Sequence, residues 1–168
     1  INTVIKKNNN IDIGNLQNQF RKIYYNSTKI KWIIKYNGKN EDILLSNIKN
    51  LKAIFGKGPV TPDHVIRIKS KPLIIDFINN KKKDFIENSI LKYVREYKKY
   101  FQKYKHTIKN VKISDPLPRI IIVPKLGYFS IGITQKEEKI SNDIFLSMKE
   151  TIIDSSYVSK FKSINQKE

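Results

Sequence analysis

The sequence predicts a single α/β domain in which a central β-sheet lies between layers of helices. Three observations lead to this prediction. Residues 85–104 repeat apolar side chains at helical spacing, residues 120–123 form the continuous apolar run typical of a strand buried on both faces, and helix-like and strand-like segments are interspersed between residues 15 and 152. A chain of this length buries roughly 70% of its unfolded surface, which is enough for one core.

The N-terminal half is expected to contain two helices and two strands. Residues 1–14 are polar and rich in asparagine, so we expect a linker or disordered segment before a domain that spans 15–154. Apolar periodicity and turn signals then predict the following elements in order: a helix over 15–25, a strand over 31–36 before the Asn37-Gly38 turn, a helix over 41–51, a glycine-rich break at 56–59 and a strand over 73–77.

The C-terminal half is expected to contain a long helix, two strands and a final helix. The helix over 85–104 has an apolar stripe on one side and basic residues on the other. Prolines force an extended turn over 114–118, and strands follow over 120–123 and 128–131. Thr134 and Glu137 fit a capping box that opens the final helix. Its predicted buried stripe is Ile140, Ile144, Met148 and Ile152.

The chain is strongly basic, with 33 lysines and arginines against 15 acidic residues and a net charge of +18. Lysine occurs 29 times and arginine 4 times, while alanine occurs once. This bias is typical of an A/T-rich genome that places lysine at neutral surface positions, whereas readers of nucleic acid favour arginine. A basic nucleic-acid-binding protein that uses the helix over 85–104 is therefore an alternative to a solvated basic surface.

Several classes of protein are excluded by composition. The chain has no cysteine, which excludes a disulfide scaffold and a thiol nucleophile. It has no apolar run long enough to cross a membrane and no signal peptide, so we expect a cytoplasmic protein without membrane partners. Because the chain begins at Ile1, we expect a processed product or an excised domain.

The densest candidate for a site is the segment 61–69. Thr61 suits a helix N-cap and Asp63 the first helical turn, which gives both a structural explanation. His64 and Arg67 are three residues apart and share a helix face, and Lys69 follows them. A phosphate or carboxylate would suit this helix N-terminus, so the whole set is predicted to bind an anionic substrate. Arg119 joins this set because its side chain is long enough to reach a cleft.

Metal and phosphate-loop signatures are missing from the sequence. The histidines at 64 and 106 have no HxH, HxxxH or HExxH spacing, and a catalytic zinc needs three protein ligands. The patterns GxSxG, GxGxxG and GxxxxGK[ST] are absent.

Four stretches in register resemble one enzyme family. They are GPVTPDHVIRIK followed by PLIIDF (58–77), YVREYKKYF (93–101), DPLPRIIIVPKLGYFSIG (115–132) and the helix over 134–152. Together they are similar to bifunctional class II aldolase/short-chain dehydrogenase proteins of the rhamnulose-1-phosphate aldolase/lactaldehyde dehydrogenase type. The resemblance covers residues 30–162 and matches the class II aldolase/adducin-like segment that precedes the dehydrogenase.

The resemblance implies a three-layer class II aldolase/adducin-like fold and a role in carbohydrate metabolism. The whole protein would cleave a deoxy-ketose 1-phosphate to dihydroxyacetone phosphate and lactaldehyde with zinc, then oxidise the aldehyde with NAD. This segment would supply scaffold, subunit interface and an anion contact to the sugar phosphate. Its partners would be the flanking aldolase and dehydrogenase modules and other copies of the chain, with 155–168 as a linker toward the dehydrogenase.

One departure from the family pattern affects the expected activity. The turn at 124–127 reads Pro-Lys-Leu-Gly where the family has a histidine-glycine turn, so the zinc histidine has no counterpart here. We therefore expect the isolated chain to be inactive and to bind no cofactor. His64 stays a candidate for catalysis or metal ligation in a site shared with another module. A non-catalytic, aldolase-like interaction module is the remaining alternative.

Overall fold

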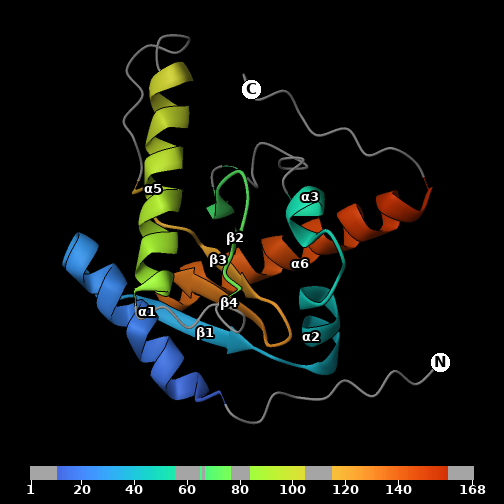
Figure 1. Ribbon diagram of the computed structural model, residues 1–168, viewed down its shortest axis with the longest axis horizontal. Helices are drawn as coiled ribbons and strands as arrows, with labels where there is room; N and C mark the ends of the chain where they lie inside the picture. Colours follow the sequence, from blue (N-terminus) through green and yellow to red (C-terminus); the bar gives the residue numbers. More distant parts are fainter. Residues whose placement is uncertain (1–10, 56–64, 66, 77–83, 105–114, 159–168) are drawn as a thin grey trace.

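A computed structural model describes residues 11–55, 65, 67–76, 84–104 and 115–158, with side chains described up to Glu150 except at Tyr104. The model confirms the predicted mixed α/β fold with helices on both sides of a sheet (Figure 1). The elements in chain order are α1 (Ile13–Thr28), β1 (Ile33–Asn37), α2 (Asn40–Ser46), α3 (Leu51–Phe55), β2 (Leu73–Ile74), α5 (Phe85–Tyr104), β3 (Ile120–Val123), β4 (Gly127–Gly132) and α6 (Gln135–Val158).

The sheet has four strands in the order β1-β4-β3-β2. β4 pairs antiparallel with β1 and with β3, whereas β2 pairs parallel with β3. Every residue of β3 and β4 is buried, as the apolar run over 120–123 predicts. The β3–β4 hairpin is therefore the centre of the domain.

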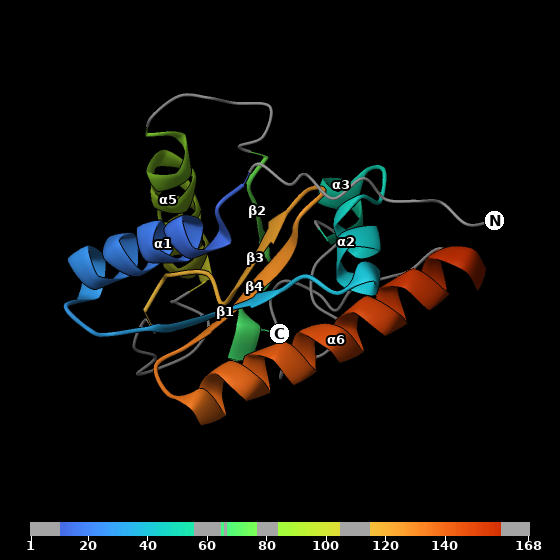
Figure 2. The same ribbon diagram turned by 90° about the horizontal axis from the view of Figure 1, so that it is seen from below.

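Side chains that alternate along the strands build one core on each face of this hairpin. Ile121, Phe129 and Ile131 pack with the apolar faces of α1 and α5. Ile122 and Tyr128 pack on the opposite face with α2, α3 and α6. Figure 2 shows this arrangement, with α1 and α5 on one side of the sheet and α6 on the other.

The helix predicted over 15–25 is confirmed as α1, which is longer at both ends. Asp12 caps its N-terminus, because its side-chain Oδ1 accepts a 3.0 Å hydrogen bond from the Asn15 amide. The half-buried side chain of Gln17 donates to the Ile34 carbonyl at 2.9 Å. This contact ties α1 to the outer edge of β1, a strand edge that would otherwise be open to pairing.

The single helix predicted over 41–51 is wrong, because α2 ends at Ser46 and α3 begins at Leu51. Asn47 closes α2, with its amide bonded to the Leu44 carbonyl at 3.1 Å. Asn50 has a φ of 62°, a left-handed conformation that asparagine tolerates better than most residues. The apolar spacing thus continues across a break between two helices, which periodicity alone does not reveal.

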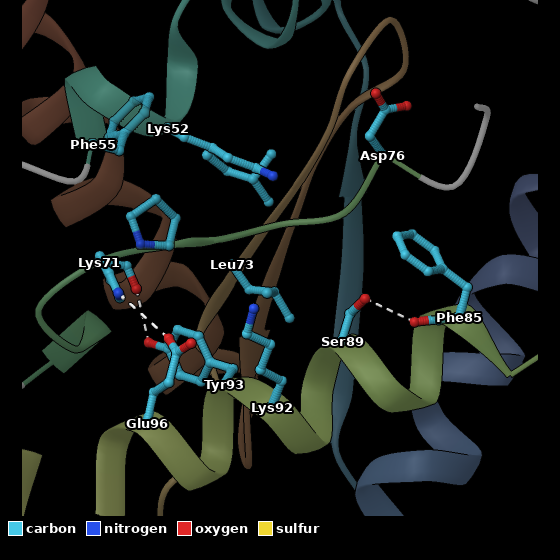
Figure 3. Close-up of a pocket in the computed structure, with 12 residues that line it drawn as sticks. Lys52, Phe55, Lys71, Leu73, Asp76, Phe85, Ser89, Lys92, Tyr93 and Glu96 are labelled. Atoms are coloured by element: carbon cyan, nitrogen blue, oxygen red, sulfur yellow. Dashed lines mark hydrogen bonds and ion pairs between the residues drawn. The ribbon is translucent and has the colours of Figure 1, made fainter. Parts of the chain in front are cut away.

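The helix predicted over 85–104 is confirmed as α5. Ile90 and Tyr93 are buried, and the Tyr93 hydroxyl donates to the Lys71 carbonyl at 2.7 Å (Figure 3). This end of the aromatic stripe therefore packs in the core. The exposed side of α5 carries basic residues: Lys92, Arg95, Lys98, Lys99 and Lys103.

Thr134 caps the final helix as predicted, because its Oγ1 accepts from the Glu137 amide at 3.2 Å. The return bond of the predicted capping box differs, since Glu137 Oε2 accepts from the Ile133 amide at 3.0 Å. Its buried side differs from the predicted stripe: Ile140 and Ile144 are half-buried, Met148 is buried, and the side chain of Ile152 lies outside the described residues. The fully buried positions of α6 are Glu138, Ser141, Phe145 and Met148.

A buried polar contact explains why the first turns of α6 face the sheet with polar side chains. The Ser130 hydroxyl of β4 donates to a carboxylate oxygen of Glu138, and Asn37 Nδ2 of β1 donates to Ser130 Oγ at 2.9 Å. A Cβ on Gly132 would lie 2.2 Å from the Glu138 amide nitrogen, so helix and strand approach at backbone distance. Ser130 and Glu138 need these hydrogen bonds because they are buried, and an unpaired polar group in a core raises the free energy of the folded state.

No helix in the described part of the chain is both long and apolar enough to cross a membrane. The predicted limits of the domain at residues 15 and 154 stay predictions.

The tight β3–β4 turn generates a stability prediction. Gly127 has a φ of 121°, and a Cβ there would lie 2.3 Å from the Asn37 carbonyl oxygen. We expect Gly127→Ala to lower the free energy of unfolding by about 3 kcal/mol or more, because strain and a backbone clash combine. Urea unfolding measures this change. Gly14→Ala, at an exposed position of α1, is the control and should change stability by less than about 1 kcal/mol. Equal losses in the two variants would contradict the strain and clash assigned to Gly127.

Candidate functional site

The structure places the residues of the predicted anion site in different surroundings. Thr61, Asp63 and His64 lie outside the described residues. Arg67 is exposed, whereas Lys69 is buried with 3% of its surface accessible. The two cations are therefore not presented together to solvent, and anion binding by the full set stays a prediction.

Lys69 occupies an unusual position for a lysine. Its backbone has a φ of 69°, and its Nζ lies 4.9 Å from the centre of the Tyr97 ring of α5. Burial lowers the pKa of Lys69 from 10.5 to about 8, and the positive charge of Arg119 acts in the same direction, while Asp115 opposes both. Lys69 therefore connects the segment around residues 67–69 to α5 and to the residues before β3.

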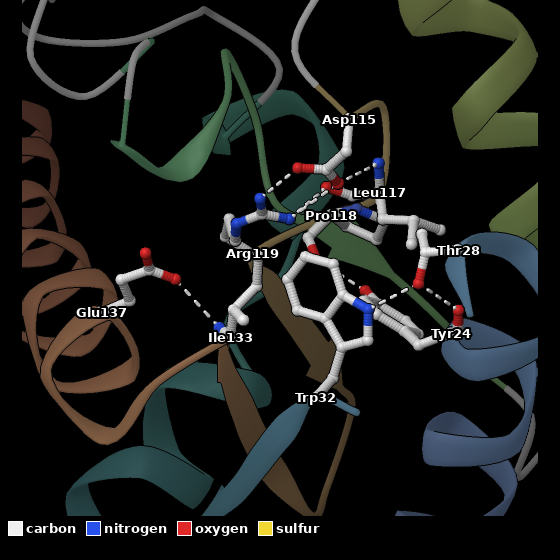
Figure 4. A network of polar contacts seen from close by, with 9 residues as sticks. All are labelled: Tyr24, Thr28, Trp32, Asp115, Leu117, Pro118, Arg119, Ile133 and Glu137. Atoms are coloured by element: carbon white, nitrogen blue, oxygen red, sulfur yellow. Dashed lines mark hydrogen bonds and ion pairs between the residues drawn. The ribbon is translucent and has the colours of Figure 1, made fainter. Parts of the chain in front are cut away.

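Arg119 is held in place by three contacts at the start of β3. Its guanidinium makes a two-point ion pair with the Asp115 carboxylate and donates to the Leu117 carbonyl at 3.2 Å. It also lies over the Trp32 ring, 4.6 Å from the ring centre. Figure 4 shows the guanidinium between Asp115 and Trp32. These contacts fix Arg119 as a positioning residue of the turn that precedes β3.

Two aromatic side chains, Tyr24 of α1 and Trp32 just before β1, contact the same turn. The Tyr24 hydroxyl donates to the Pro118 carbonyl, and Trp32 Nε1 donates to Thr28 Oγ1 at 2.9 Å. Burial raises the pKa of Tyr24 well above its usual value, so this phenol stays a neutral donor. The sequence analysis did not identify this network, because its members are up to 94 positions apart.

The cluster of Lys69, Arg119 and Asp115 carries two positive charges and one negative charge. Arg119 has most of its hydrogen-bonding capacity used by Asp115 and Leu117. Lys69 is covered from solvent. These three residues position the start of β3 through their contacts. Because Lys69 is buried and Arg119 is bonded to Asp115, the three described residues do not form an open cationic surface for an anion.

A second feature is a cavity of about 410 Å³ beside β2, which the sequence analysis did not predict. Three lysines and two carboxylates line it together with apolar side chains from α3, β2 and α5 (Figure 3). The sequence signal for it is weak: Lys92 and Glu96 are four residues apart on α5, but the contribution of α3 depends on tertiary packing. Its lining is Lys52, Phe55, Lys71, Pro72, Leu73, Ile74, Asp76, Phe85, Ser89, Lys92, Tyr93 and Glu96.

The described residues do not fit the zinc centre that the resemblance implies for the whole protein. They contain no group of three histidine, cysteine or acidic side chains that could hold a metal ion. The β3–β4 turn bends through Lys125, which has a φ of 66°, and buries Leu126 in the core. Neither side chain is a zinc ligand.

The buried amine of Lys69 generates a pH prediction. The unfolded chain holds this proton up to a pH near 10.5, whereas the folded chain releases it near 8. Between these pH values the unfolded state binds more protons, so the free energy of unfolding rises with pH, by up to about 3 kcal/mol. We expect Lys69→Met to lack this rise, as measured by urea unfolding between pH 7 and 10. Lys35→Met, at an exposed position, should keep the wild-type slope; if Lys69→Met keeps it too, the buried-amine assignment is wrong.

Comparisons with known proteins find a matching family model, a curated relative and a similar solved structure. A family model described as "Aldolase class II, second domain" matches residues 15–168. The chain is 23% identical over 147 residues to YuxG of Bacillus subtilis (strain 168), described as an uncharacterized oxidoreductase, with 84% of this chain and 21% of YuxG covered. It thus spans about a fifth of that relative. The crystal structure of YgbL from Escherichia coli, a candidate aldolase/epimerase/decarboxylase, is similar with a TM-score of 0.49 and 14% identity over 79% of this chain and 53% of YgbL. Because the family model covers all but the first 14 residues, the chain belongs to the class II aldolase second-domain family.

Proposed function

We propose that this chain acts as the second, aldolase-like domain of a larger carbohydrate-metabolising enzyme, in which other modules hold the zinc and the NAD. In this role it supplies scaffold and interfaces. The observation that carries the proposal is the β3–β4 turn, where the implied zinc histidine is replaced by side chains with other structural roles.

The turn is built for packing. The Leu126 amide donates to the Val123 carbonyl at 3.0 Å, and the Tyr36 hydroxyl of β1 donates to the Leu126 carbonyl at 2.7 Å. Leu126 itself is buried in the core on the α1–α5 side of the sheet. A turn with these contacts ties β1 to the central hairpin and has no donor directed at a metal.

The small share of YuxG that this chain matches supports a role as one domain of a larger protein. The match covers 21% of YuxG, a protein described as an oxidoreductase. A domain of this family beside an oxidoreductase module is the arrangement expected of a bifunctional enzyme. We propose that the whole enzyme cleaves a deoxy-ketose 1-phosphate to dihydroxyacetone phosphate and lactaldehyde and oxidises the aldehyde with NAD, and that copies of it associate.

The proposal is tested on the native protein and on the 168-residue chain in parallel. An antibody against the chain captures the native protein from its source cells, and mass spectrometry gives its mass and its flanking peptides. Both samples are assayed for zinc content, for release of dihydroxyacetone phosphate from a deoxy-ketose 1-phosphate, and for reduction of NAD with lactaldehyde.

We expect the native protein to be several times longer than 168 residues, to contain zinc and to catalyse both reactions. The isolated chain should bind less than about a tenth of an equivalent of zinc and catalyse neither reaction, because its described residues lack a ligand set. Stoichiometric zinc on the isolated chain would overturn the scaffold role. A native protein of only 168 residues would overturn the larger enzyme and favour an interaction module.

A further inference from the structure

The cavity beside β2 has a strand edge as its floor and helices as its walls. Among the strands that the structure describes, β2 pairs with β3 alone, and side chains of α3 and α5 line the cavity beside it. The volume of about 410 Å³ is in the range of small-molecule sites. Figure 3 shows Lys52 reaching in from α3 and Lys92 from α5, with Leu73 between them.

Within β2, the backbone amide and carbonyl of one residue are directed toward this open edge. The Ile75 amide donates to the Ile122 carbonyl at 3.0 Å, so Ile75 is directed at β3. Because successive residues of a strand alternate in direction, the amide and carbonyl of Ile74 are directed away from β3. Pro72 has no amide to donate. Within β2 the open edge therefore offers one N–H donor, that of Ile74, which suits one acceptor group of a ligand. The strand is too short for a peptide to extend the sheet by a ladder of hydrogen bonds.

Some of the charged side chains that line the cavity have an ion-pair partner and others do not. Lys71 Nζ lies 3.6 Å from Glu96 Oε2, so this pair is mutually compensated. Asp76 also interacts with a neighbour. Neither Lys52 nor Lys92 has an ion-pair partner among the described residues. Two ammonium groups on opposite walls are thus available to one ligand.

The remaining surface is apolar. Phe55 is buried beneath the α3 wall, and Leu73 and Phe85 contribute half-buried side chains. Lysine binds phosphate as a point charge, and two lysines match the double negative charge of a phosphate monoester better than the single charge of a carboxylate. The apolar wall then suits a short carbon skeleton.

We propose that this cavity binds a small phosphate monoester, with its phosphate between Lys52 and Lys92 and near the Ile74 amide, and its carbon skeleton against Leu73 and Phe85. The site stands apart from the cluster around Lys69 and Arg119, neither of which lines the cavity. The inference uses the geometry of the cavity alone, so it does not depend on the proposed function.

The test is isothermal titration of the full 168-residue chain with glycerol 3-phosphate, and with inorganic phosphate and glycerol as separate probes. We expect saturable binding of glycerol 3-phosphate, competition by inorganic phosphate and no binding of glycerol. Lys52→Gln and Lys92→Gln should each weaken binding about three- to fivefold, the range expected for exposed charge pairs, and the double variant should weaken it about tenfold or more, because the two effects multiply. Circular dichroism checks that the variants fold.

Lys98→Gln is the matched control, because Lys98 is exposed on α5, carries the same charge and does not line the cavity. It should change the affinity less than twofold. An equal loss in Lys98→Gln would overturn the site, since binding would then reflect the overall basic charge. Binding that is unchanged in the double variant, or no binding to the wild-type chain, would also overturn it.

Discussion

The constraint on which the rest of the structure depends is the complete burial of the β3–β4 hairpin. All residues of both strands are covered, so each face of the sheet needs its own layer of helices. Phe129 directs its ring toward α1, 5.1 Å from the centre of the Phe20 ring, and Tyr128 directs its ring toward α6, 4.8 Å from that of Phe145. The three layers follow from the alternation of these two neighbouring residues.

Because the hairpin is buried, its polar residue Ser130 helps to determine the register of β4. Ser130 is fully buried and is satisfied by Asn37 on one side and Glu138 on the other. A shift of β4 by one residue would place an apolar side chain opposite Glu138 and leave its carboxylate without a donor. Hydrogen bonding thus selects the register that hydrophobic burial alone would leave less strictly determined.

The sequence predicted the elements that are determined locally. A continuous apolar run is sufficient for β3, and a stripe of periodic aromatic and aliphatic residues is sufficient for α5. The break between α2 and α3 was missed because Asn50 adopts its left-handed conformation without disturbing the apolar spacing. The buried side of α6 was predicted only in part, because Glu138 is buried through a partner eight residues away on another element.

The candidate sites were harder to predict, because lysines of the same sequence character have different roles here. Lys69 is buried over Tyr97 and stabilises a connection between elements, whereas Lys98 is one of many exposed lysines on the surface. Lys52 and Lys92 differ from both, because they belong to helices that meet across the open edge of β2. Composition explains the number of lysines and not their positions. A function for any of them therefore has to be argued from burial and from convergence on a cavity, two properties that the fold creates and that the net charge of +18 does not reveal.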